Sequence, residues 1–266
     1  MSAPNEIAET ARELYQLYRQ RNPFPPLPEP FASGTVEDAY PIQEEYLKLL
    51  IADQGEVVGY KLAYTTQTMQ QIAGWDQPCA GALLSNTICP SPARLEGANY
   101  QRLGIECELA VQLGSDLPAE AAPYDREKVS QYVGAVMPAF EVIDIRVQEG
   151  LSGKERTLIS VATNISNAGA VLGAAVTDWR QIDLPGLHCQ LKINGEEAGE
   201  GYGSEVMGHP LEPLVWLANW RARQGLGLSQ GSIVITGSII APRFLNPGDR
   251  AVLTMTGLGE VHLTVG

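Results

Sequence analysis

Two glutamates two residues apart, Glu106 and Glu108, are the first feature of the sequence that could carry chemistry. They lie in the segment GIECELAVQLG (104–114), in which glutamates alternate with apolar residues as expected of a β-strand. Side chains two apart on a strand point the same way and lie about 6.5–7 Å apart. Two carboxylates so placed repel each other unless water screens them or a cation lies between them. An isolated pair of this kind is most often a solvated strand face, so the choice depends on other residues.

A third glutamate, Glu141, lies in a segment of mostly apolar residues, MPAFEVIDIR (137–146). An ionised carboxylate in such a segment is costly unless it is paired or bound to a metal. Three carboxylates without a histidine make a hard oxygen site that suits Mg²⁺ or Mn²⁺, with positions left for water and substrate. Zinc is disfavoured because no two histidines are spaced as a ligand pair. His188 and His262 fall on expected strands, and His209 is expected to open a helix, in a packing or capping role at least as readily as a catalytic one.

A lysine within an apolar strand is the natural partner for these carboxylates. Lys61 lies inside the segment GYKLAYTT (59–66), and a buried lysine is rare without a partner. It either forms a structural salt bridge or lies near the metal, where its charge helps to neutralise a substrate carboxylate or a developing enolate. The segment VITGS (234–238) is expected to lead from a strand into a turn, where the hydroxyls of Thr236 and Ser238 and the backbone amides could bind an oxyanion; an ordinary turn would look the same.

The N-terminal part of the chain is expected to form a helical cap. Residues 3–21 carry one apolar stripe at helical spacing, and residues 22–31 are a proline-rich connector. A second helix is expected to start near Thr35, with Asp38 in its first turn and with a kink or a later start at Pro41. We expect the cap to span residues 1–55 and a catalytic β-rich domain to span residues 56–266, as one continuous structural unit.

Strands dominate the rest of the chain. They are expected at 57–65, 104–114, 133–145, 157–173, 187–194, 231–237 and 249–265, with helices near 66–73, 124–132 and 210–224, the last of which Gly225 can cap. Asn194-Gly195 is the strongest hairpin signal, and residues 254–265 are predicted to form a second hairpin. Because few β-α-β alternations occur, we expect an α+β fold with a mostly antiparallel or mixed sheet and peripheral helices.

Composition narrows the classes of partner. The formal net charge is −13 and no Lys/Arg cluster stands out, which disfavours nucleic acid. No apolar run is long enough for a membrane span, and the N-terminus resembles no signal peptide, so we expect a cytoplasmic protein without a membrane partner. The four cysteines, Cys79, Cys89, Cys107 and Cys189, show no CxxC pairing and are expected to be reduced thiols.

The sequence resembles the 2-keto-4-pentenoate hydratase and 4-oxalocrotonate decarboxylase family, within the fumarylacetoacetate hydrolase superfamily. The resemblance extends along nearly the whole chain, because motifs that are weak alone occur in the family's order and spacing. These are PFPPL, EDAYPIQ (37–43), GYKLAYTT, GWDQP (74–78) followed by GALL, IECELAVQLGSDL (105–117), PAFEVIDIR, ATNISNAG (162–169), GHPLEPLVWLAN (208–219), ITGS and GLGEVHL (257–263).

This resemblance implies a fold built on a rolled, barrel-like mixed β-sheet with helices outside it. It implies Mg²⁺ or Mn²⁺ on the three glutamates, Lys61 as the catalytic residue beside the substrate, and a homo-oligomer, possibly in complex with a paralogous decarboxylase or hydratase. It also implies that Asp76 and Ser166, together with Thr236 and Ser238, contribute to binding a small 2-oxo or 2-hydroxydienoic acid.

Two departures from the family pattern bear on the reaction. Cys79 stands where many members have an acidic residue after DQP, and Thr163 stands where the family usually has the aspartate of DNAS. The resemblance implies a hydratase that adds water to a 2-hydroxy-2,4-dienoate in the catabolism of aromatic-ring cleavage products. The alternatives are a decarboxylase of a 4-oxalocrotonate-like diacid, a C–C bond hydrolase, which is less favoured because no histidine–glutamate dyad is evident, and a catalytically silent metal-binding subunit.

Arg243 raises the question of a second substrate carboxylate. It follows the VITGS segment by a few residues, in TGSIIAPRF (236–244). A dicarboxylic substrate needs a cation at the far end of its pocket, and a guanidinium suits that role. The alternative is that Arg243 faces solvent on the loop before Asn246-Pro247-Gly248.

Overall fold

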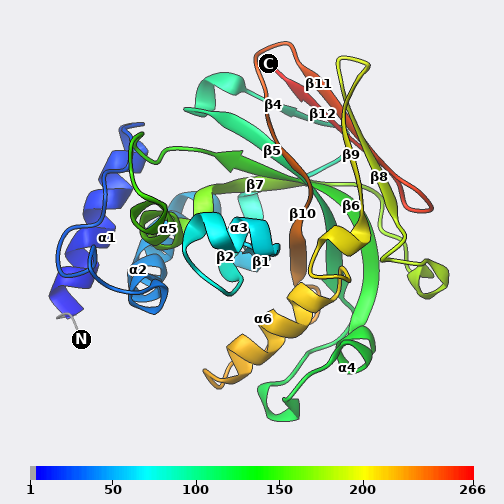
Figure 1. Cartoon of the computed structure of the whole chain (residues 1–266), viewed down its shortest axis with the longest axis horizontal. Coiled ribbons are helices and arrows are strands. Elements are labelled where there is room, and N and C mark those ends of the chain that lie inside the picture. Colours follow the sequence, from blue (N-terminus) through cyan, green and yellow to red (C-terminus); the bar gives the residue numbers. More distant parts are fainter. Residues whose placement is uncertain (1–3) are drawn as a thin grey trace.

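The chain folds into two curled β-sheets that face each other, with helices at one side and at one end (Figure 1). The structure is a computed structural model that describes residues 4–266. Its helices are α1 (Pro4–Arg19), α2 (Val36–Gln54), α3 (Gln67–Ala73), α4 (Arg126–Ser130), α5 (Gly153–Ala162) and α6 (Glu212–Ala222). Its strands are β1 (Val57–Ala63), β2 (Cys79–Leu84), β3 (Ile88–Pro90), β4 (Ala93–Leu95), β5 (Leu103–Leu113), β6 (Val133–Asp144), β7 (Asn167–Leu172), β8 (His188–Ile193), β9 (Glu196–Tyr202), β10 (Ile233–Phe244), β11 (Arg250–Met255) and β12 (Gly259–Val265).

Both sheets mix parallel and antiparallel pairs. The seven-stranded sheet has the order β2-β1-β10-β5-β6-β7-β3, and the five-stranded sheet has the order β4-β12-β11-β8-β9. The pairs β1–β10, β3–β7 and β4–β12 are parallel, and the others are antiparallel. The expected α+β fold with a rolled mixed sheet and peripheral helices is therefore confirmed.

The two faces of β5 explain how this arrangement positions the glutamates. Ile105, Cys107 and Leu109 are buried in the cluster that fills the space between the sheets, together with residues of β8, β11 and β12. Because successive side chains on a strand alternate between faces, Glu106 and Glu108 point to the opposite side. That face of the seven-stranded sheet carries a separate cluster of buried apolar side chains, which β2, β5, β6, β7 and β10 supply.

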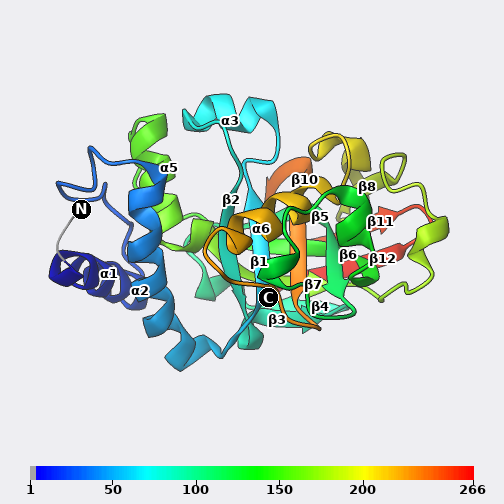
Figure 2. The same ribbon diagram turned by 90° about the horizontal axis from the view of Figure 1, so that it is seen from below.

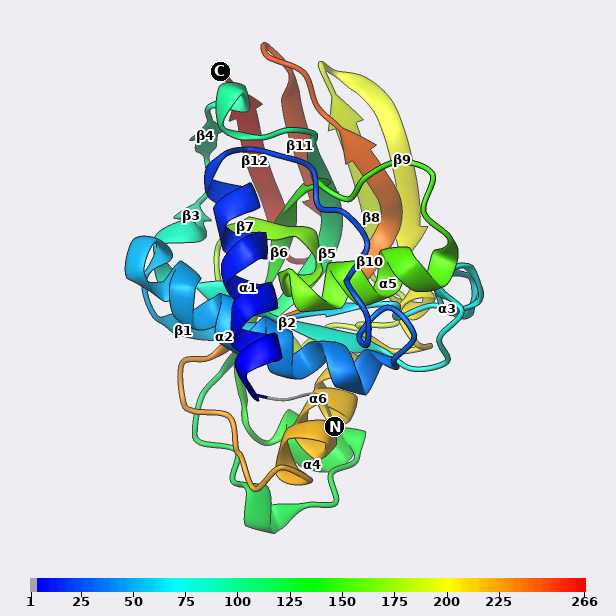
Figure 3. The same cartoon turned by 90° about the vertical axis from the view of Figure 1, so that its left-hand side faces the viewer.

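The helical layer consists of α1, α2 and α5, which lie side by side across one end of the sheets (Figure 3). Helix α2 begins after Thr35, where the Asp38 carboxylate accepts hydrogen bonds from the Thr35 N–H and hydroxyl in the expected capping arrangement. The later start at Pro41 is not observed, since α2 begins at Val36 and continues through Pro41 to Gln54. The first expected helix is present from Pro4, and residue 3 lies outside the described residues.

The first part of one expected strand is a helix. Residues 157–173 were predicted to be extended because they are rich in β-branched residues, but α5 covers residues 153–162 and only Asn167–Leu172 form a strand. A capping box at Ser152 and Glu155 starts the helix. Burial of Leu158, Ile159 and Val161 against the helical layer then outweighs their weak local preference for a strand.

The other elements agree closely with the sequence. The Asn194-Gly195 hairpin joins β8 to β9, and a second hairpin joins β11 to β12. The three later helices lie where they were expected, at α3, α4 and α6, and Gly225 follows α6 with the positive φ of a C-terminal cap. Strands β2, β3 and β4, between residues 79 and 95, were not predicted. All four cysteines are free, and within residues 4–266 no helix is long and apolar enough to cross a membrane.

Candidate metal centre

The three glutamates converge at the centre of the seven-stranded sheet. Strands β5 and β6 pair antiparallel, with Glu106 directly opposite Glu141 and Glu108 two residues further along β5. One carboxylate oxygen from each of the three lies within 4.8 Å of the others. Glu108 and Glu141 are completely buried, and Glu106 is half-buried. The solvated strand face that would make a glutamate pair unremarkable is therefore ruled out by burial.

Lys61 completes the cluster from β1. Its Nζ lies 3.0 Å from Glu141 Oε1, and the side chain is buried. Burial alone lowers the pKa of Lys61, but the charges of Glu141, Glu106 and Glu108 outweigh it and raise the pKa above its usual value. The lysine is therefore a permanent cation here, as both sequence interpretations required.

One ammonium does not neutralise three buried carboxylates. Burial and the neighbouring charge of Glu141 raise the pKa of Glu106 to about 7. Burial and the charges of Glu141 and Glu106 raise the pKa of Glu108 well above its usual range. Glu108 Oε1 and Glu141 Oε2 are buried with no hydrogen-bond partner among the described residues. Surplus negative charge and unpartnered carboxylate oxygens fit a hard divalent cation such as Mg²⁺ or Mn²⁺.

Two hydrogen bonds that the sequence did not predict hold the carboxylates in place. The Gly237 N–H donates to Glu108 Oε2 at 2.6 Å. The Asn167 side-chain amide donates to Glu141 Oε1 at 2.9 Å. The TGS sequence indicated that a backbone amide near Gly237 could bind an anion. Nothing near Asn167 in the sequence indicates a contact with a glutamate 26 residues away.

The turn expected at 234–238 is not observed, whereas the substrate-binding role expected of Thr236 and Ser238 stays a prediction. Strand β10 continues through this segment to Phe244, and a bulge between Ile235 and Ser238 accommodates Gly237 at a φ of 114°. The Thr236 hydroxyl donates to the Leu109 carbonyl at 3.0 Å, and the Ser238 hydroxyl donates to the Ile240 carbonyl at 2.6 Å. A glycine that bends the strand without ending it explains why a turn signal lies within a strand.

Asp76 and Ser166, two other residues predicted to bind substrate, lie in different parts of the fold. Asp76 is exposed in the loop after α3, where it lines a surface pocket with Trp75; Figure 2 shows α3 standing out from the body of the molecule. Ser166 is half-buried and lines a small cavity of about 170 Å³ beside Asn167. Neither has a described contact with Lys61 or the glutamates, so their roles stay predictions.

Arg243 is neither on a loop nor free. It lies on β10, and its guanidinium donates to the carbonyls of Ala198, Ala241 and Pro242. The bond to Ala198 ties β10 to β9, while the other two stay within β10. Its predicted role as a substrate anchor remains a question for experiment.

The two departures from the family pattern lie near the cluster. Cys79 is fully buried, and its thiol is hydrogen-bonded with the Tyr40 hydroxyl. Burial raises the pKa of the Cys79 thiol to about 12, so the thiol stays protonated. The Thr163 hydroxyl donates to the Ile159 carbonyl at 2.7 Å and serves the end of α5. Neither position can therefore supply a carboxylate.

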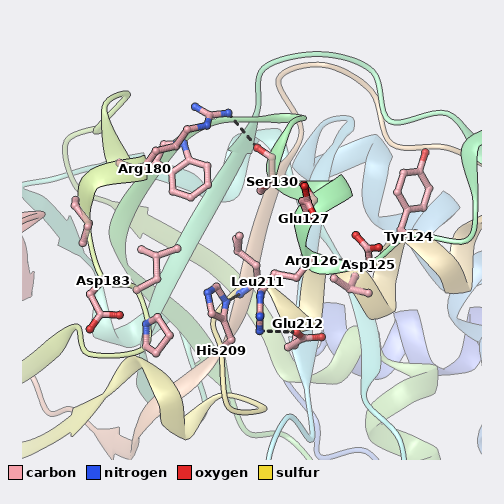
Figure 4. Close-up of a pocket in the computed structure, with 15 residues that line it drawn as sticks. Tyr124, Asp125, Arg126, Glu127, Ser130, Arg180, Asp183, His209, Leu211 and Glu212 are labelled. Atoms are coloured by element: carbon pink, nitrogen blue, oxygen red, sulfur yellow. Dashed lines mark hydrogen bonds and ion pairs between the residues drawn. The ribbon is translucent and has the colours of Figure 1, made fainter.

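A surface groove of about 870 Å³ lies elsewhere, between α4, the start of α6 and residues 179–185. Figure 4 shows His209 beside Leu211 at this groove, with Arg126 paired to Glu212. The His209 ring accepts a hydrogen bond from the Leu211 N–H, and helix α6 begins only at Glu212, so His209 precedes the helix instead of opening it. Burial lowers the pKa of His209. The ring contacts the backbone just before α6, and α6 itself has no side-chain cap.

Comparison with known proteins places the chain in a family. Residues 61–266 match the profile of the fumarylacetoacetate (FAA) hydrolase C-terminal family, and the chain belongs to that family. It is 30% identical over 259 residues to a 2-keto-4-pentenoate hydratase of Paraburkholderia xenovorans, covering 97% of this chain and 94% of the relative. It is 31% identical over 265 residues to a 2-hydroxyhexa-2,4-dienoate hydratase of Comamonas testosteroni, covering 99% and 98%.

A solved structure of similar shape is the 4-oxalocrotonate decarboxylase from Pseudomonas putida G7, complexed with magnesium and adipate. It superposes with a TM-score of 0.91 at 25% identity, covering 100% of this chain and 99% of that one. The family that the sequence resembles is thereby confirmed over the whole chain, N-terminal helices included.

Proposed function

We propose that this protein is a divalent-metal-dependent lyase: a hydratase that adds water to a 2-hydroxy-2,4-dienoate and yields a 4-hydroxy-2-oxo acid, in the catabolism of aromatic-ring cleavage products. The observation that carries the proposal is the buried cluster of Glu106, Glu108, Glu141 and Lys61. The two similar hydratases, which align with nearly the whole chain, support the choice of reaction.

The three glutamates would hold Mg²⁺ or Mn²⁺. Such an ion polarises substrate oxygens and stabilises the negative charge that an enolate develops. Lys61 adds a fixed positive charge at the same place, which favours an enolate over the neutral substrate. The Gly237 N–H and the Asn167 amide hold Glu108 and Glu141 in place, so the carboxylates need little reorganisation when a substrate binds.

The second candidate is a carboxy-lyase acting on a 4-oxalocrotonate-like diacid. The full-length structural similarity to a 4-oxalocrotonate decarboxylase favours it. Both reactions draw on the same stabilised enolate, so the cluster serves either. The Cys79 thiol stays protonated and cannot serve as a general base in either reaction. The base that moves the proton after the enolate has formed must therefore be another group.

The test is a turnover assay on one monocarboxylic and one dicarboxylic substrate, 2-hydroxypenta-2,4-dienoate and 4-oxalocrotonate. Loss of dienoate absorbance is followed with Mn²⁺ and with a chelator, and Glu106→Gln is the matched control. We expect Mn²⁺-dependent hydration of the monoacid and little activity in the variant. Release of carbon dioxide from the diacid would replace the hydratase by the decarboxylase. Mn²⁺ binding without turnover of either acid would favour a catalytically silent subunit.

We further propose a cytoplasmic homo-oligomer, possibly assembled with a paralogous decarboxylase or hydratase. Support comes from the family resemblance and from large apolar side chains that are exposed on the single chain, such as Ile72 and Phe244. Light scattering of the purified chain at micromolar concentration would give its mass, and a monomer would refute this part of the proposal.

A further inference from the structure

Three consecutive residues between α5 and β7 adopt a left-handed backbone. Asn164, Ile165 and Ser166 have φ values of 62°, 53° and 55°, and none of them is glycine. Each such residue costs of order 1–3 kcal/mol and persists only where the surroundings hold it. A β-branched isoleucine in this region is the most unusual of the three. The turn is therefore held against its own preference by contacts on both sides.

On one side the turn is fastened to β2. The Asn164 amide accepts a hydrogen bond from the Ala82 N–H at 2.7 Å and donates one to the Ala82 carbonyl at 2.9 Å, as a neighbouring strand would. Next to it, Gly81 pairs with Lys61 in the sheet. A Cβ on Gly81 would lie 2.9 Å from Asn164 Oδ1 and 3.3 Å from Lys61 Cγ. The turn thus packs directly against the strand position beside the catalytic lysine.

On the other side the turn delivers Asn167 to Glu141. The register of β6 and β7 shifts so that Ile143 pairs with Asn167 and Val142 with Gly169. This bulge places the Asn167 side chain on the face that carries Glu141. Its amide and the Lys61 ammonium then donate to the same oxygen, Glu141 Oε1, at 2.9 Å and 3.0 Å. The other oxygen, Oε2, has no described partner.

We propose that the segment 163–169 is a positioning element for the Lys61–Glu141 pair, and this inference rests on the proposed function. Asn164 fixes the strand beside Lys61, and Asn167 fixes Glu141 through Oε1, which reserves Oε2 for the metal. Asn164 and Asn167 are positioning residues, because they act on the metal centre through Lys61 and Glu141. The left-handed backbone of residues 164–166 lets the Asn164 amide reach β2 beside Lys61 and the Asn167 amide reach Glu141.

The test measures Mn²⁺ affinity by calorimetry, together with the free energy of unfolding in the presence of a chelator. Asn167→Ala removes the hydrogen bond to Glu141 and should weaken Mn²⁺ binding by about 10–100-fold, as for other groups that orient a metal ligand. Asn164→Gly removes the two hydrogen bonds to Ala82, while glycine tolerates the positive φ. This variant should weaken Mn²⁺ binding by several-fold and should reduce turnover by a larger factor.

Asn219→Ala is the matched control. Asn219 makes the same two-way amide contact with a backbone, accepting from the Tyr124 N–H and donating to the Tyr124 carbonyl, both at 2.8 Å, but it lies on α6 away from the glutamates. This variant should lose stability and keep wild-type Mn²⁺ affinity. If Asn167→Ala and Asn164→Gly behave like it, the turn is merely structural and the inference is overturned. If the wild type itself binds no Mn²⁺, the proposed function fails first and the inference fails with it.

Discussion

Replacing Lys61 by methionine separates a structural salt bridge from a charge that serves the metal centre. Methionine keeps much of the length and apolar surface of lysine, and removes only the ammonium. In the absence of metal, Lys61 is the one cation in contact with the described oxygens of this cluster. The variant therefore leaves the buried Glu141 without its partner charge, beside Glu106 and Glu108.

The size of the effect follows from the geometry. Unit charges 3.0 Å apart attract by about 5–6 kcal/mol at an effective dielectric constant near 20, and desolvation of the ammonium offsets part of this. Removing one member of a buried pair costs about 3–5 kcal/mol. Glu106 and Glu108 can relieve some of the repulsion by taking up protons, since the pKa of each is already raised. We expect a loss of about 3 kcal/mol without metal.

Mn²⁺ should reverse most of this loss, because a divalent cation among the glutamates replaces the missing charge. We expect the variant to bind Mn²⁺ as tightly as the wild type or more tightly, and to lose less than about 1 kcal/mol when the metal is saturating. Turnover should still fall by about 100-fold or more, because the charge beside the substrate is gone. Metal cannot restore that second effect.

The assay is urea unfolding of both proteins with a chelator and with saturating Mn²⁺, followed by turnover at saturating metal. Lys192→Met is the control, since Lys192 forms an exposed pair with Glu197 at 3.1 Å and should change stability by less than about 1 kcal/mol under both conditions. Wild-type turnover by Lys61→Met would refute the catalytic role. A stability loss that Mn²⁺ does not reduce would show that Lys61 is a structural partner only.

Three further predictions concern the metal, the second anchor and the thiols. Wild-type protein should melt several degrees higher with Mn²⁺ at about 100 times its dissociation constant, worth about 2.7 kcal/mol, whereas Glu106→Gln and Glu141→Gln should show no such shift in a thermal scan. Arg243→Ala should lower the free energy of unfolding by about 1–3 kcal/mol, because three backbone carbonyls lose a donor; a selective loss of activity on dicarboxylic over monocarboxylic acids would instead establish the substrate anchor. Of the four thiols, only Cys89 is not fully buried, so a thiol reagent should label about one cysteine per folded chain; rapid labelling of Cys79 would contradict its burial and its pKa of about 12.

The chemistry of the metal centre could be predicted because it depends on residue types and strand alternation. Glu106 and Glu108 share a face on any strand through this segment, and an apolar run around Glu141 signals a carboxylate that needs a partner. That Glu141 lies directly opposite Glu106 depends on the pairing of β5 with β6, which joins residues 35 positions apart. Local patterns do not specify such a pairing, and here the resemblance to a family supplied it.

The two local errors have different physical causes. At residues 157–162 the β-branched composition favoured a strand, but the capping box of Ser152 and Glu155 and burial beside α2 favoured a helix, and tertiary packing outweighs propensity of this size. At Gly237 the small residues indicated a turn, but the glycine makes a bulge inside β10 and turns its N–H toward Glu108. The capping box was visible in the sequence, whereas the purpose of the bulge was not.

Burial is what converts the predicted strand face into a candidate metal centre. The same three glutamates on an exposed strand would be screened by water and would need no cation. Here the apolar cluster between the two sheets fills one face of β5, and a separate cluster from β2, β5, β6, β7 and β10 lies on the other, so Glu108 and Glu141 are fully buried. If all three carboxylates were ionised, they and one ammonium would leave a surplus of two negative charges in a region of low dielectric constant, and this surplus is what raises the pKa values of Glu106 and Glu108. A divalent cation matches that surplus. We therefore expect that replacing a glutamate lowers metal binding, metal-dependent stability and turnover together. Replacing Lys61 should lower turnover while metal binding is kept.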